Sequence, residues 1–273
     1  MRRLLPAILI NAALVAGALA TLLPLAWMLS ASLMPTGEAS AVPPRLLPSA
    51  VTLEHYRALF TRLDLARHVA NSAFLATVVT AIALALNSMA GYAFAKLRFP
   101  GRDRIFRVLL AALVIPAQVA MLPLFLLLRM IGAVDSYAGL VVPGIASVFG
   151  IFLVRQYALG LPDGVLDAAR VDGAGELRVW WAIALPLCAP ILVTLAVFTF
   201  MGTWNDFMWP LIVLADAKRY TLPVALANLA GEHVQDTELM MAGAVLTVLP
   251  VVVVFVFLQK YYLAGIMTGG TKE

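Results

Sequence analysis

Six long apolar runs separated by shorter polar segments dominate the pattern of the chain. Each run holds about 20 or more mostly apolar residues, enough for a helix to cross roughly 30 Å of hydrocarbon at about 1.5 Å per residue. The pattern therefore predicts six transmembrane helices, over residues 6–29, 69–94, 106–130, 137–157, 183–208 and 239–263. We expect an all-α, polytopic membrane protein in which residues 1–273 form a single transmembrane domain.

The first run has some features of a secretory signal peptide. Arg2 and Arg3 precede it, and small residues near Ala31 resemble a cleavage site. A signal peptide has an apolar region of only about 7 to 15 residues, and this run is longer. We expect an anchor that is not cleaved.

Lysine and arginine residues predict the orientation in the membrane. If the N-terminus is inside, 12 of these residues fall in cytoplasmic segments and 7 fall outside. We therefore expect a protein of the inner membrane with both termini in the cytoplasm. The densest group, from Lys96 to Arg107, lies in one short loop between two spans. Contact with acidic lipid is a second interpretation of that group.

The composition excludes several other classes of protein. With 63% hydrophobic and 12% charged residues, the chain is too apolar for a soluble domain. Its single cysteine, Cys188, cannot form an internal disulfide, and the three histidines are far apart without a second ligand at metal spacing. Basic residues are scattered between apolar blocks, so we expect membrane lipid and no nucleic acid as a partner.

Two outer segments are too long to be simple turns. Residues 32–68 contain four prolines and then an amphipathic stretch over 53–60, with Tyr56 and Phe60 expected on its apolar face. Residues 215–238 carry several acidic residues and are polar enough to meet water or a protein partner.

The inner segment over residues 161–182 predicts two short helices at the membrane surface. Pro162 suits the first turn of a helix, and the carboxylate of Asp163 complements the positive end of its dipole. Gly173 then permits a turn, a second helix is expected over 175–181, and Pro186 should loosen the start of the fifth span. The small side chains of Ala168 and Ala169 would let another protein approach the first helix closely.

This segment resembles the EAA loop of ATP-binding-cassette (ABC) importer permeases. The pattern is an acidic-Ala-Ala triplet, a Gly six residues after the acidic residue, an Ile ten after the Gly and a Pro thirteen after it. The resemblance implies a type I ABC importer permease fold and a coupling helix that docks on a cytoplasmic ATPase. The implied coupling residues are Asp167, Ala168, Ala169, Asp172, Gly173, Ile183, Leu185 and Pro186. Asp167 stands where the family usually has Glu. An ordinary amphipathic interfacial linker is the alternative.

Further stretches are similar to the carbohydrate branch of this family, the maltose-permease type and its second membrane subunit. They are Thr52, Leu53, Tyr56, Asn71, Ser72, LRFPGR (97–102), FGIFLVRQ (149–156), WNDFMWP (204–210) and MAGAV (241–245). The resemblance implies a second homologous permease, two ABC ATPase subunits that hold ATP and Mg, and an extracytoplasmic solute-binding protein. The sequence has no GxxxxGK[ST] loop, so no cofactor is expected on this chain itself.

Polar residues inside apolar runs are the candidates for the translocation pathway. Gln118 lies between Pro116 and Pro123, and Trp204, Asn205 and Asp206 cluster near the outer end of the fifth run. Interhelical hydrogen bonding and an interfacial aromatic belt are the respective alternatives. The resemblance also implies that residues 215–238 reach toward the binding protein and that the tail over 267–273 lies near the ATPases.

The sequence predicts a carbohydrate importer subunit rather than an enzyme, with two other transport functions left open. A glycerol-phosphate type solute is one, because such relatives share most of these motifs. A secondary transporter driven by an ion gradient is the other, but it should place carboxylates or histidines at mid-membrane, and apart from Asp206 near a span's end these are missing. The six apolar runs contain no Ser/His, paired-carboxylate or HExxH arrangement, so the sequence does not favour an intramembrane enzyme.

Overall fold

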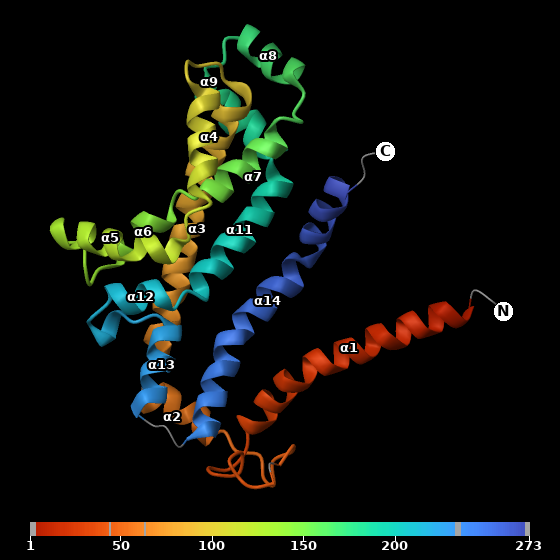
Figure 1. The fold of residues 1–273 in the computed structure, drawn as a ribbon, viewed down its shortest axis with the longest axis vertical. Helices are drawn as coiled ribbons and strands as arrows, with labels where there is room; N and C mark the ends of the chain where they lie inside the picture. The colour runs from red at the N-terminus through yellow and green to blue at the C-terminus, as the bar shows by residue number, and fades with distance from the viewer. Residues whose placement is uncertain (1–3, 44, 63, 233–235, 271–273) are drawn as a thin grey trace. The chain divides into compact units, whose positions relative to one another are not determined.

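The computed structural model describes residues 4–43, 45–62, 64–232 and 236–270, and every regular element in these ranges is helical (Figure 1). The predicted all-α class is therefore confirmed for the described chain. Arg2, Arg3 and the last three residues of the predicted tail lie outside these ranges. The elements are α1 (Leu4–Ala31), α2 (Glu54–Arg62), α3 (Leu65–Lys96), α4 (Arg102–Ala112), α5 (Ala117–Met130), α6 (Tyr137–Gly144), α7 (Val148–Ala158), α8 (Asp163–Val171), α9 (Glu176–Val179), a π-helix (Trp180–Ala184), α10 (Leu185–Leu187), α11 (Ala189–Trp204), α12 (Met208–Val213), a 3-10 turn (Ala217–Arg219), α13 (Leu222–Glu232) and α14 (Thr237–Gly270).

Four helical segments in the described ranges are long and apolar enough to cross a membrane without a sharp bend. They are Leu9–Ala31, Leu65–Lys96, Tyr137–Ala158 and Thr237–Phe257, which overlap four of the six predicted spans. The other two predicted spans are each divided into a bent pair. Arg102–Ala112 and Ala117–Met130 meet at 102°, and Glu176–Leu187 and Ala189–Trp204 meet at 82°. The number of spans is six if each bent pair counts as one.

Prolines explain both bends, because proline has no backbone N–H for the helical ladder. Pro116 stands at the N-cap of α5 with an extended ψ of 134°, which ends the preceding helical path. Pro186 and Pro190 flank Cys188, whose ψ of 2° separates α10 from α11. The expected loosening near Pro186 is thus present as a break.

The chain divides into two compact units, of which one contains residues 68–224 and 251–273. In this unit α3, α4, α7 and α11 run side by side (Figure 1). Gly91 of α3 faces Val154 of α7 so closely that an added Cβ would lie 2.7 Å from the Val154 Cβ. Asn87, one turn earlier, is fully buried, and its Oδ1 accepts a hydrogen bond from the Ser147 backbone N–H at 3.1 Å. The close approach at Gly91 and the hydrogen bond at Asn87 therefore fix how α3 lies along α7.

A single carboxylate, that of Asp135, organises the end of this unit that lies away from α8. Its Oδ1 accepts the backbone N–H groups of Ala215 and Asp216, each at 3.0 Å, and its Oδ2 accepts Arg219 Nη1 at 2.8 Å. The N–H groups of Asp216 and Ala215, with the charge of Arg219, hold the pKa of Asp135 below its usual value. The loop before α6 is thereby tied to the segment after α12.

The second unit contains residues 1–67 and 225–250. Its α2 buries His55 and Leu59, whereas Phe60 is 47% exposed. The expected amphipathic stretch forms a helix, but its buried face differs from the predicted Tyr56 and Phe60 face because His55 turns inward and its Nε2 donates to the Met34 carbonyl at 2.9 Å. Glu238 at the start of α14 accepts the Ala39 N–H at 2.7 Å.

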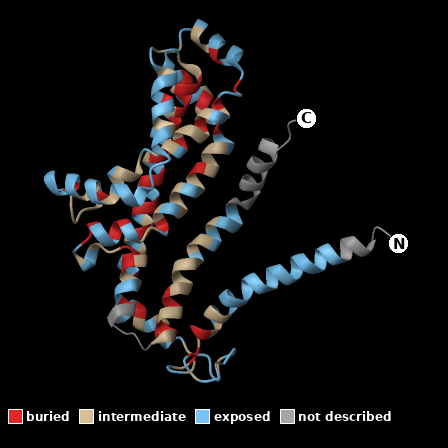
Figure 2. Cartoon of the chain, in the orientation of Figure 1, coloured by how far each residue is buried: buried red, intermediate tan, exposed pale blue. Residues whose placement is uncertain are grey.

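Apolar side chains of α1 are exposed along most of its length (Figure 2). A helix that is apolar all round and uncovered by its own chain is suited to contact lipid or another apolar protein surface.

Substitution of Gly91 by Val should destabilise the chain, because the new Cβ must displace Val154 and the backbone beside it. We expect a loss of about 1–3 kcal/mol, the usual cost of overpacking, measured by thermal unfolding in detergent. Gly202→Val in α11 is the control, because no atom lies within 4 Å of its added Cβ. Equal losses for the two variants would contradict the close α3–α7 packing.

Candidate functional site: surface helix α8 and its anchoring contacts

Helix α8 is bounded by the residues that the sequence predicts. Pro162 occupies the N-cap and Asp163 the first turn. At the other end Gly173 has a φ of +85°, and the Ala174 N–H returns to the Ala169 carbonyl at 2.9 Å. This left-handed residue satisfies carbonyls at the helix end and turns the chain into α9. Both short helices are confirmed.

The inward face of α8 is anchored by one apolar side chain. Leu166 is 0% exposed and packs in a cluster with Tyr92, Ala95, Ala158, Leu161, Val179, Trp180, Ala184 and Cys188. Most of these residues come from α3, α7, α9 and the π-helix, while Leu161 precedes α8 and Cys188 lies between α10 and α11. Full burial of a leucine side chain stabilises by about 1.5–3 kcal/mol. Leu166 therefore fastens α8 to the inner core of this unit.

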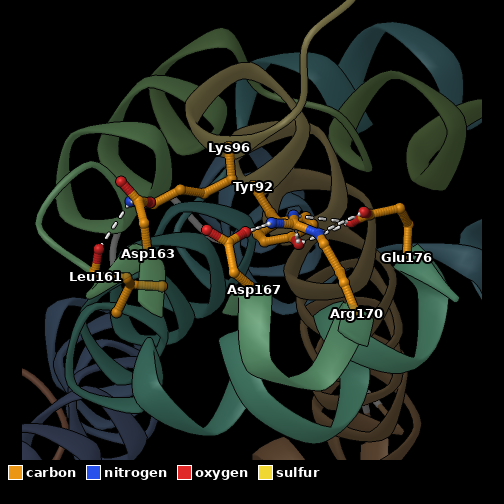
Figure 3. A network of polar contacts seen from close by, with 7 residues as sticks. All are labelled: Tyr92, Lys96, Leu161, Asp163, Asp167, Arg170 and Glu176. Atoms are coloured by element: carbon orange, nitrogen blue, oxygen red, sulfur yellow. Dashed lines mark hydrogen bonds and ion pairs between the residues drawn. The ribbon is translucent and has the colours of Figure 1, made fainter. Parts of the chain in front are cut away.

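Arg170 joins α8 to two other helices through its guanidinium group (Figure 3). Nε and Nη2 donate to the two carboxylate oxygens of Glu176 in α9, at 2.7 and 3.2 Å, and Nη2 also lies 3.3 Å from the Tyr92 hydroxyl of α3. Nη1 donates to Asp167 Oδ1 at 2.7 Å, one turn earlier on α8. The hydrogen bond to Glu176 is the main reason that the pKa of Arg170 lies above its ordinary value. Arg170 thus stays charged and held from both sides.

Lys96 makes the second polar connection, at the end of α3. Its ammonium group donates to the Leu161 carbonyl at 2.8 Å and to Asp163 Oδ1 at 2.6 Å (Figure 3). A lysine that reaches carbonyls just past a helix end satisfies acceptors that the helix leaves unpaired. It joins α3 to the chain between α7 and α8.

The structure divides the predicted coupling residues into an exposed and a packed set. The exposed set consists of Asp167, Ala168, Asp172 and Gly173 on or beside α8, and of Pro186 in α10. The packed set lies against the apolar cluster and consists of Ala169, Ile183 and Leu185. Val165 and Val171, the latter 87% exposed, add apolar surface to the outward side of α8. The outward side is therefore made of small and apolar side chains next to carboxylates.

The four predicted pathway residues are not gathered in one place. Asp206 lines a cavity of about 420 Å³ whose walls are mostly apolar and come from α3, α5, α6, α11 and α12. Gln118 and Asn205 are exposed and do not line it. Trp204 is buried, with its ring stacked on Phe200 at a centroid distance of 6.1 Å. Of these four residues, Asp206 alone lines the cavity.

Three residues that hold α8 in place, namely Tyr92, Lys96 and Glu176, were not predicted as site residues, and Lys96 was used only as part of the basic group that predicts the orientation. Tyr92 and Lys96 are four residues apart near the end of α3, a spacing that places both on one helix face. Within the described ranges no three His, Cys, Asp or Glu side chains gather as a metal site.

Replacing Arg170 with Gln should lower stability by about 1–2 kcal/mol, since it removes charge-assisted hydrogen bonds from a partly exposed site. Thermal unfolding of the detergent-solubilised chain measures the loss. Arg178→Gln in α9 removes the same charge from an exposed side chain and should change stability by less than about 0.5 kcal/mol. Similar effects of both variants would contradict the role given to Arg170.

Stability should depend on pH through Asp163. The hydrogen bond from Lys96 holds the pKa of Asp163 below its ordinary value, so the folded state gains stability above the unfolded-state pKa of about 3.9 and loses it as the pH falls through the folded-state pKa. Asp163→Asn should therefore melt at a lower temperature than the wild type at pH 7, with a difference that shrinks toward pH 3. Asp172→Asn, which removes an exposed carboxylate from the same loop, is the control. A difference between wild type and Asp163→Asn that stays constant with pH would show that Asp163 acts without its charge.

Comparison with known proteins places this geometry in a family. Residues 83–267 match the family described as "Binding-protein-dependent transport system inner membrane component". The chain is 38% identical over 226 residues to the arabinooligosaccharides transport system permease protein AraQ of Halalkalibacterium halodurans, covering 82% of this chain and 81% of that protein. It is 34% identical over 199 residues to the sn-glycerol-3-phosphate transport system permease protein UgpE of Yersinia pestis bv. Antiqua, covering 72% and 71%.

The fold is similar to that of a solved transporter. A chain in the crystal structure of a bacterial ABC transporter involved in the import of the acidic polysaccharide alginate superposes with a TM-score of 0.82 and 26% identity, covering 93% of this chain and 95% of that one. The expected type I ABC importer permease fold is confirmed. The chain belongs to the family of inner-membrane components of binding-protein-dependent transport systems.

Proposed function

We propose that the chain is one of two homologous permease subunits that form the translocation pathway of an ATP-driven carbohydrate importer. Two separate ABC ATPases, holding ATP and Mg, supply the free energy, and an extracytoplasmic binding protein delivers the solute. The family match and the similarity to permeases with oligosaccharide and polysaccharide importers support this assignment. Sugars, oligosaccharides and polyols are the proposed substrate class.

Helix α8 has one exposed side made of small and apolar residues, while its other side is attached to the rest of the unit, and this observation carries the proposal. The exposed side, which a partner ATPase can approach closely, consists of Val165, Ala168, Val171 and Gly173. The carboxylate of Asp167 is 66% exposed and remains accessible to a basic group of the partner. Leu166 and Arg170 connect the same helix to α3 and α9. A displacement of α8 by the ATPase would thus pass directly to the spans.

ATP-dependent closure of the ATPases would shift the equilibrium between inward-open and outward-open states. The nucleotide acts by binding one state of the transporter more tightly than the other. Ala169, Ile183 and Leu185 pack against the apolar cluster that holds α8 in place. Asp206 in its cavity is the proposed contact of this subunit with the pathway.

The basic loop supports an orientation with α8 and both termini in the cytoplasm. Residues 97–101 lie at the same end of their unit as α8 (Figure 1). Short loops rich in Lys and Arg are retained on the cytoplasmic side. Cysteine labelling of Val171→Cys from each side of the membrane checks this orientation, with labelling expected only from the inside.

Gly173→Val should abolish most uptake, because φ = +85° costs a β-branched residue at least about 1–2 kcal/mol while no neighbouring atom obstructs its side chain. The substitution would distort the turn that follows α8, and less of the ATPase would copurify with the chain. Gly175→Val is the matched control, since Gly175 has φ = −68° and equally open surroundings. Normal uptake by Gly173→Val would contradict the assigned role of α8.

Reconstitution in proteoliposomes separates the proposed function from its alternatives. The chain, its partner permease, the ATPases and the binding protein are tested with mono- and oligosaccharides and with sn-glycerol 3-phosphate, with and without ATP and an ion gradient. Saccharide uptake that requires ATP supports the proposal. Uptake of the phosphate ester alone, favoured by the similarity to UgpE, corrects the substrate class, and uptake driven by an ion gradient without ATP contradicts the mechanism.

A further inference from the structure

A hollow of about 600 Å³ lies where α3 passes into α4, and arginines dominate its lining. Its walls are Arg98, Phe99, Gly101, Arg102, Asp103, Arg104 and Arg107. Four arginines and a single acidic residue thus line it. Asp103 is occupied by Arg102, whose Nε donates to Asp103 Oδ1 at 3.1 Å. Arg98 acts electrostatically on the carboxylate of Asp163, and among the described residues neither Arg98 nor Arg104 forms an ion pair within 4.0 Å.

The backbone that carries these arginines is held firmly. Phe94 of α3 contacts the rings of Phe99 and Phe106, with centroid distances of 5.8 and 5.4 Å. Arg155 of α7 stacks over Phe106 at 4.1 Å and donates to the Phe94 carbonyl at 3.2 Å. Arg102 Nη1 donates to the Leu97 carbonyl at 3.2 Å. The arginine side chains are therefore presented from a fixed loop rather than from a solvated tail.

An anion is the ligand that this lining fits. Guanidinium groups bind phosphate through paired N–H donors, and several of them around one hollow leave positive charge that a phosphodiester would neutralise. The hollow also contains the start of α4, whose N-cap Gly101 offers no side-chain cap. The positive end of that helix dipole adds to the attraction for an anion.

The continuation of α4 identifies the source of the phosphate. Val108 follows Arg104 by four residues, so both lie on one face of the helix, and Val108 is 71% exposed. Ile105 in α4 is also exposed and apolar, as are Val114 and Ile115 just beyond the end of the helix. A free anion would gain nothing from this apolar surface, whereas the acyl chains of a phospholipid would cover it once the headgroup occupied the hollow.

We propose that the Arg98, Arg102, Arg104 and Arg107 hollow is a binding site for the phosphate headgroup of an anionic phospholipid, with the acyl chains along the exposed apolar face of α4. Residues 97–101, which link α3 to α4, lie at the same end of this unit as α8 (Figure 1). It does not depend on which solute the transporter carries.

Native mass spectrometry of the full-length transporter in a non-ionic detergent tests the site. The probes are dioctanoyl phosphatidylglycerol, dioctanoyl phosphatidylcholine and inorganic phosphate. We expect phosphatidylglycerol to bind more tightly than phosphatidylcholine. Because each arginine near anionic lipid contributes roughly fivefold in affinity, Arg104→Gln with Arg107→Gln should weaken phosphatidylglycerol binding roughly 25-fold. Arg98→Gln, outside α4, should weaken it roughly fivefold and serves if the double variant does not fold.

The matched control is Arg129→Gln with Arg178→Gln, which removes the same charge from exposed sites outside the hollow. It should change phosphatidylglycerol binding less than twofold, and Arg104→Lys with Arg107→Lys should retain more binding than the glutamine pair. Equal binding of the two lipids, or equal effects of the two glutamine pairs, overturns the proposal. Displacement of phosphatidylglycerol by inorganic phosphate at the same concentration overturns it as well, since the site would then recognise free phosphate.

Discussion

The guanidinium group of Arg170 is the contact on which the arrangement of the site depends. It is bound by carboxylates from α8 and α9 and lies within hydrogen-bonding distance of a hydroxyl of α3, so one planar cation defines how three helices meet. Arginine suits this position because its donors form a rigid fork and its charge persists at physiological pH. Leu166 adds apolar attachment beneath it. Helix α8 is thereby part of the helical unit while its outward side stays free for a partner.

Single charged side chains fix the helix junctions at both ends of this unit. Lys96 binds the Leu161 carbonyl beside α8, and Asp135 binds the N–H groups of Ala215 and Asp216 at the other end. Between these ends the prolines at 116, 186 and 190 interrupt the helical hydrogen bonds and permit bends of 102° and 82°. The ends are thus tied by charge-assisted hydrogen bonds, and the bends occur where the backbone lacks donors. The tied end connects α8 to α3 and to the chain that follows α7.

Local sequence patterns predicted the helical class, the short helices over 161–182 and the turn at Gly173, because each depends on residues within a few positions. The bends were harder to predict from the sequence, because a proline inside an apolar run is compatible with either a kinked or a broken span. The contact of Arg170 with Tyr92 joins residues 78 positions apart, and no local pattern marks such a pair. Trp204 and Asp206 are two residues apart, yet one is buried and the other lines a cavity, because α11 ends between them.

The central claim is that α8 moves as one body with the inner ends of its own helices. Spin labels at Val171 in α8 and Val108 in α4, both exposed, allow that distance to be measured by electron–electron double resonance in the assembled transporter, without nucleotide and with ATP trapped. We predict one narrow distance distribution with the same mean in both states. A mean that shifts between the states, or a broad distribution in either of them, would show that α8 moves independently of these helices and would contradict the account.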